Sequence, residues 1–126
     1  MPRHLLIGLV LLASPAALAQ GLGLAPLTDR FAICTGRFAA LMEYRWVRDD
    51  PGVAETAAQL ETMRELLAAV VEPGTSGLVL SREVEAKLAF ERLLTRAERN
   101  ERVSDADWAR ARADSEIATC TALILP

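Results

Sequence analysis

Apolar residues recur every three or four positions in four separate stretches after residue 27, which is the period of an amphipathic helix. The stretches cover roughly residues 28–48, 51–72, 78–99 and 104–123. Breakers separate them, such as Asp50-Pro51 and Pro73-Gly74. Because the two-residue alternation of strands is nearly lacking, the pattern predicts an all-α fold.

Helix starts are predicted from capping residues. Thr28 is expected to cap the first helix, and Asp50 followed by Pro51 indicates a cap and first turn for the second. Ser104 with Asp107 approximates a capping box for the fourth helix, with Val103 and Trp108 as a hydrophobic staple.

Four helices of about 20 residues would each be about 30 Å long, and short turns favour antiparallel neighbours. The predicted fold is therefore an up-down-up-down four-helix bundle, and a three-helix domain with an irregular segment is the alternative. The apolar period also predicts which side chains of residues 78–99 face the core. They are Leu80, Val84, Leu88, Phe90, Leu94 and Ala97.

The N-terminus has the three parts of a secretory signal peptide: a basic start with Arg3, an apolar run over residues 5–13, and the small-residue site Ala17-Leu18-Ala19. Cleavage is predicted after Ala19, and the run is too short to span a membrane. The expected organisation is a signal peptide (1–19), an irregular leader (20–27) and one helical domain (28–126). Arginine-rich, lysine-poor composition favours a bacterial protein, so the predicted location is the periplasm or the exterior.

The two cysteines of the chain, Cys34 and Cys120, fall near the start of the first predicted helix and near the end of the last. An up-down-up-down bundle brings these positions to the same end, and an oxidising compartment permits their pairing. The sequence therefore predicts a structural disulfide. A redox-active pair is the alternative, but catalytic dithiols usually lie close together in sequence.

The chain carries a formal net charge of −3, which disfavours nucleic-acid binding. Its one histidine, His4, lies in the predicted signal peptide. The processed protein would therefore lack histidine triads and histidine-ligated metals. No cofactor or metal is expected, and any catalysis would depend on carboxylates, arginines or Tyr44.

Aromatic and basic side chains are the candidates for an interaction surface. Trp46 and Trp108 are predicted at the bundle end opposite the disulfide, near Tyr44, either as a joint aromatic cap on the core or as an exposed binding patch. Arginines also recur at helical spacing, either as a solvated face or as a docking site for an acidic partner. They include Arg92, Arg96 and Arg99.

Small residues recur on the first predicted helix, at Ala32, Gly36, Ala39 and Ala40. Glycine inside a helix costs about 1 kcal/mol relative to alanine, so a backbone is expected to approach closely there. That backbone belongs either to a neighbouring helix of the same fold or to a partner.

These observations favour a non-catalytic, exported protein that binds another periplasmic protein or serves as an accessory or regulatory module. A periplasmic stress chaperone is the second hypothesis, and an enzyme that uses carboxylates is the third. The sequence specifies neither the partner nor the oligomeric state.

Overall fold

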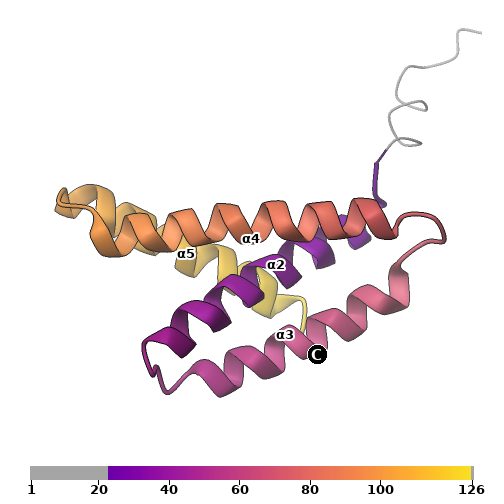
Figure 1. Ribbon diagram of the computed structural model, residues 1–126, viewed down its shortest axis with the longest axis horizontal. Coiled ribbons are helices and arrows are strands. Elements are labelled where there is room, and N and C mark those ends of the chain that lie inside the picture. Colours follow the sequence, from indigo (N-terminus) through magenta and orange to yellow (C-terminus); the bar gives the residue numbers. More distant parts are fainter. Residues whose placement is uncertain (1–22, 126) are drawn as a thin grey trace, which may run out of the picture.

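A computed structural model describes residues 23–125, and its regular structure consists of four α-helices with no strand in that range. The helices are α2 (Pro26–Val47), α3 (Val53–Val70), α4 (Ser76–Arg99) and α5 (Val103–Ala122). They alternate in direction along the chain (Figure 1). The predicted all-α, antiparallel four-helix bundle is confirmed. The predicted signal peptide lies outside the described residues.

The first helix begins earlier than predicted and without the expected cap. Pro26 is its first residue, where a missing N–H and a fixed φ favour helix initiation. Thr28 is instead buried inside α2, and its hydroxyl donates a hydrogen bond of 3.3 Å to the carbonyl oxygen of Val70. This bond fastens the start of α2 to the end of α3.

The caps predicted for the second and fourth helices are also wrong. The carboxylate of Asp50 accepts a hydrogen bond of 2.7 Å from the backbone N–H of Gly52 within the turn, and α3 starts only at Val53. Helix α5 starts one residue before Ser104 and has no side-chain cap, and Asp107, the expected capping-box partner of Ser104, pairs instead with Arg110 at 3.0 Å. In both cases a local polar contact engages an acidic residue of the predicted cap.

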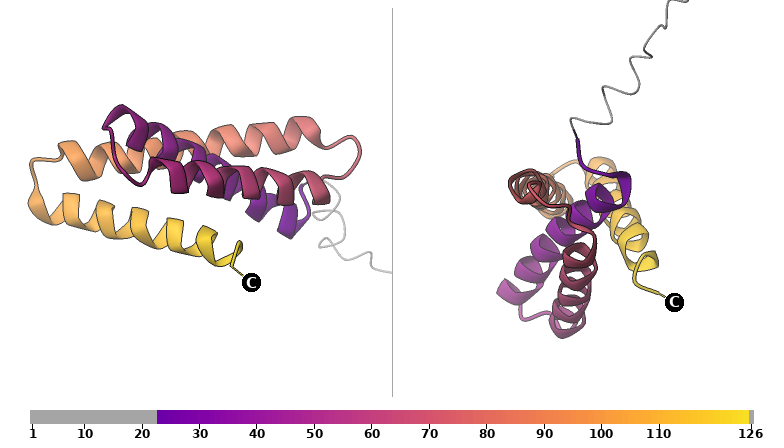
Figure 2. Two further views of the ribbon diagram at one scale, coloured as in Figure 1. Left: turned by 90° about the horizontal axis from the view of Figure 1, so that it is seen from below. Right: turned by 90° about the vertical axis from the view of Figure 1, so that its right-hand side faces the viewer.

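Helix α2 is the central element of the bundle. It packs against the other three helices, most extensively against α4, and α5 also packs against α4. The end-on view in Figure 2 shows α3 and α5 set apart from each other. Helices α3 and α4 also make little direct contact, so the helices are packed unevenly around α2.

Small residues explain why α2 and α4 lie so close together. Ala32 and Ala40 are buried, and a Cβ atom added to Gly36 would fall 2.3 Å from the carbonyl oxygen of Glu83 and 2.8 Å from the backbone nitrogen of Lys87. The interpretation of the small residues as a helix–helix contact within the fold is therefore confirmed for Gly36.

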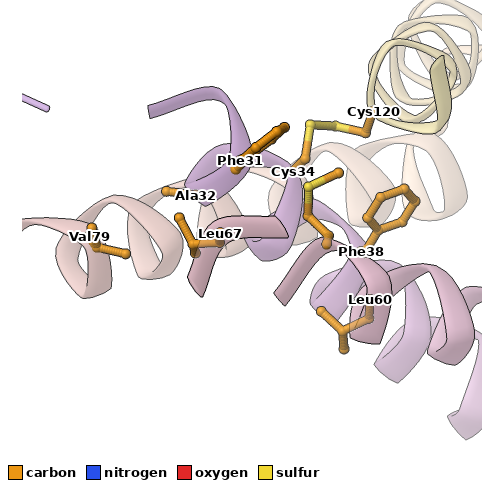
Figure 3. Close-up of a cluster of buried hydrophobic side chains, with 9 residues drawn as sticks. Phe31, Ala32, Cys34, Phe38, Leu60, Leu67, Val79 and Cys120 are labelled. Atoms are coloured by element: carbon orange, nitrogen blue, oxygen red, sulfur yellow. A yellow bond between two sulfur atoms is a disulfide. The ribbon is translucent and has the colours of Figure 1, made fainter. Parts of the chain in front are cut away.

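The predicted disulfide is present and lies in the larger of two hydrophobic clusters (Figure 3). Cys34 and Cys120 are both buried, with 5.4 Å between their Cα atoms, and they join α2 to α5. Phe38, Leu60 and Met63 are among the most deeply buried large side chains of this cluster. A smaller cluster follows along α2, α4 and α5. It comprises Ala40, Leu41, Phe90, Leu94 and Ala113.

The predicted core face of α4 is only partly correct. Phe90 and Leu94 are buried as predicted, but the core also takes Val79 and Ala86, while three predicted core residues are exposed. These are Leu80, Val84 and Leu88. Helix α4 carries two apolar rows, and the close contact with Gly36 turns the row containing Ala86 toward α2.

Candidate binding surfaces

The exposed row on α4, which we call the α4 stripe, consists of Leu80, Val84 and Leu88. Their exposed fractions are 61%, 47% and 47%. Residues four apart on a helix lie on the same face, so the three side chains form a continuous line. The stripe is therefore an apolar surface that no helix in the described part of the chain covers.

A groove adjoins the stripe between α3 and α4, and α2 lines one part of it. It consists of two neighbouring hollows of about 300 and 190 Å³, both lined by Arg64 and Glu83. Leu80 lines the first hollow and Val84 the second. Apolar side chains of α2, of α3 and of the residue that follows α3 complete this α3–α4 groove. They are Ala39, Met42, Leu60, Leu67, Ala68 and Val71.

Charged groups stand along the groove with both signs present. Lys87 pairs with Glu43 at 2.7 Å and lies 3.8 Å from Glu91. Burial raises the pKa of Glu83, and the nearby charge of Arg64 offsets only part of this effect. Burial in this partly apolar surface therefore favours the neutral form of Glu83 more than solvent does.

At the far end of the stripe, Leu88 meets part of the predicted arginine surface. A shallow hollow of about 440 Å³ is lined by Leu88, Arg92 and Arg96, together with Glu91 and Thr95. Arg92 and Arg99 are exposed. Arg96 forms an ion pair with Asp105, and its guanidinium group lies over the ring of Trp108, 4.8 Å from the ring centre.

The two tryptophans do not form the aromatic cap that was one of the two expectations. Trp46 is 70% exposed and Trp108 is 53% exposed. Trp46 follows the core residue Leu41 by five positions, which is well off the buried face of a helix with 3.6 residues per turn. Tyr44 is half-buried, and the guanidinium group of Arg48 lies 3.6 Å from its ring centre.

A second cleft, the α4–α5 cleft, lies between these two helices with α2 at its base and has a volume of about 510 Å³. Trp108 lines it, as do three arginines and two glutamates. Glu116 lies 3.3 Å from Arg37 and 3.0 Å from Arg112, and Glu85 lies 2.9 Å from Arg82. Each of these two carboxylates is therefore engaged by at least one arginine.

Residues 23–125 contain no group of three or more His, Cys, Asp or Glu side chains placed to hold a metal ion. None of their helices is both long and apolar enough to cross a membrane. No protein-family model, curated protein or solved structure matches the chain. The surfaces of the molecule are therefore the basis for a functional proposal.

Sequence reasoning missed the α3–α4 groove and assigned the α4 stripe to the core. The spacing of Leu80, Val84 and Leu88 was visible in the sequence as a series of every fourth residue. A second series on the same helix, Ala86, Phe90 and Leu94, has the same spacing. Periodicity alone does not state which of two such series is buried.

Proposed function

We propose that this chain is an exported, non-catalytic protein of the periplasm that binds another protein through the α4 stripe and the α3–α4 groove. The observation that carries the proposal is the exposed line of Leu80, Val84 and Leu88 beside an apolar groove. Single exposed apolar residues are common on proteins, but an ordered row beside a concave surface is typical of an interface. The three-part N-terminal pattern and the disulfide support export.

An amphipathic helix of the partner is the ligand that fits this surface. A groove with helical walls and apolar pockets accepts the apolar face of such a helix, with anchors every three or four residues. Full burial of a leucine or valine side chain contributes about 1.5–3 kcal/mol, and the stripe residues start about half exposed. Covering all three would therefore contribute about 3 kcal/mol.

Affinity capture from periplasmic extract, followed by binding measurements with the purified partner, tests the proposal. Leu80→Ser and Leu78→Ser form a matched pair, since both leucines lie on α4 and are 61% and 51% exposed, but only Leu80 lies in the stripe. We expect Leu80→Ser to weaken binding by about fivefold and Leu78→Ser to leave it unchanged, and adding Val84→Ser to Leu80→Ser should bring the loss to about tenfold or more. Equal losses in both variants, or a chain that recovers no partner, would contradict the proposal.

Glu83 favours a stress chaperone as the second candidate function. Because the pKa of Glu83 is raised by burial, acidification neutralises it before ordinary glutamates, and the groove then becomes more apolar. Such a chaperone would suppress aggregation of client proteins better in mild acid than at neutral pH. A Glu83→Gln variant should be similarly active at both pH values. No suppression at either pH would exclude this function.

A further inference from the structure

The α4–α5 cleft has two chemically different ends. Its lining runs along α4 from Arg82 to Leu93 and along the antiparallel α5 from Glu116 to Trp108. Arg82 and Glu116 therefore share one end, which is charged, while Leu93 and Trp108 share the other, which is apolar. A volume of about 510 Å³ lies within the range of about 300–1,000 Å³ that is usual for small-molecule sites.

Three arginines supply more hydrogen-bond donors at the charged end than their carboxylate partners use. Arg37 lies with its Nε 3.3 Å from Glu116, and Arg112 donates from its Nε to the same carboxylate. Arg82 donates from its Nε to Asp29 and from its Nη1 to Glu85. A guanidinium group has five N–H donors, so each arginine keeps donors for a further acceptor.

The electrostatic surroundings of Arg37 also favour an additional anion. Burial lowers the pKa of its guanidinium group, and the positive charges of Arg112 and Arg82 lower it further, while Glu116 opposes this effect. Glu116 therefore offsets only part of the effect of burial and of the two neighbouring cations. A further anion bound nearby would act in the same direction as Glu116.

We propose that the α4–α5 cleft binds a small organic anion with an apolar body, whose acidic group contacts the arginines Arg37, Arg82 and Arg112 and whose body lies against Leu93 and Trp108. Guanidinium groups recognise carboxylates, sulfonates and phosphates through paired, charge-assisted hydrogen bonds. An aromatic or aliphatic body gains energy by covering the apolar end of the cleft. This site is distinct from the α3–α4 groove and does not depend on it.

Fluorescence titration of the purified protein tests this site, with 1-anilinonaphthalene-8-sulfonate as the probe. N-phenyl-1-naphthylamine is the matched control, because it has the same rings without the sulfonate. A Trp46→Phe background leaves Trp108 as the single tryptophan. We expect saturable quenching of Trp108 at one probe per chain. The sulfonate should bind about tenfold more tightly than the neutral compound, the effect of a charge-assisted contact.

Two arginines of α5 provide the matched variants. The side chains of Arg112 and Arg110 are both 58% exposed, and each pairs with a carboxylate on its own helix, but only Arg112 lines the cleft. Arg112→Gln should weaken binding of the sulfonate probe by about five- to tenfold, and Arg110→Gln should leave its binding unchanged. Arg37 still pairs with Glu116 in the Arg112→Gln variant, so the fold should persist. Equal binding of the two probes, equal effects of the two variants, or unquenched Trp108 would overturn the proposal.

Discussion

Replacing Gly36 with alanine tests the close contact between α2 and α4, the most extensive helix pair of the fold. The new methyl group would meet the carbonyl oxygen of Glu83 at 2.3 Å, whereas carbon–oxygen contacts are normally about 3.3 Å or longer. The helices would have to separate by about 1 Å, since the opposing atoms belong to the backbone. A gap of that size forfeits a quarter to a half of the dispersion energy along the contact.

Two effects of opposite sign decide the result. Overpacking of a core typically costs about 1–3 kcal/mol, and the rigid backbone of α4 places this substitution at the upper end. Alanine gains about 1 kcal/mol over glycine in a helix. The net expectation is a loss of about 2 kcal/mol in the free energy of unfolding, or about 8–16 °C in Tm for a domain of this size.

Urea and thermal unfolding, followed by circular dichroism with the disulfide intact, measure this loss. Gly77→Ala is the matched control, because Gly77 lies in the first turn of α4 and a Cβ atom there meets nothing within 4 Å. That variant should be unchanged or more stable by up to about 1 kcal/mol. If Gly36→Ala stabilises the protein as Gly77→Ala does, α2 and α4 do not approach as described.

Two further predictions concern the disulfide and the groove. Reduction, or replacement of Cys34 and Cys120 by serine, should lower the free energy of unfolding by about 4.5 kcal/mol in the loop-entropy model, measured by urea unfolding with and without reductant. An unchanged urea midpoint after reduction would contradict a stabilising role for the disulfide. Glu83→Gln should raise the free energy of unfolding at pH 7. Burial raises the pKa of Glu83 in the folded state, so folding favours its protonated form, which glutamine resembles. The advantage of the variant should disappear below the ordinary glutamate pKa, where Glu83 is protonated in both the folded and the unfolded state. Unfolding curves of the two proteins at pH 7 and pH 3 test this pH dependence. If the variant is still more stable at pH 3, burial of the charged Glu83 carboxylate is not the cause of the stabilisation.

The helices and the disulfide were predictable because local and long-range signals agreed. Asp50-Pro51 and Pro73-Gly74 interrupt the apolar period close to the observed helix ends. Alternating directions bring the start of the first helix and the end of the last together, and Cys34 and Cys120 lie at these positions. The starts of α3 and α5 differ from prediction by one or two residues, and at each an acidic residue of the predicted cap makes a local contact, Asp50 with Gly52 and Asp107 with Arg110.

The rotation of α4 was not predictable from its own sequence. Two apolar series run along it with the same spacing, and nothing in the sequence of the helix indicates which of them is buried. The choice depends on α2, where Gly36 allows the backbone of α4 to approach at Ala86. Surfaces that depend on this rotation, including the α4 stripe, could be found only from the three-dimensional structure.

The small residue that brings α2 and α4 together also accounts for the two concave surfaces. Because α4 lies directly on α2, α3 packs on α2 and α5 packs mainly on α4, and α3 is left with little direct contact to α4. The space between α3 and α4 becomes the α3–α4 groove, and the space beside α5 becomes the α4–α5 cleft. A larger residue at position 36 would therefore alter the shape of both surfaces as well as the stability. Gly36 links the sequence of one helix to both proposed binding activities.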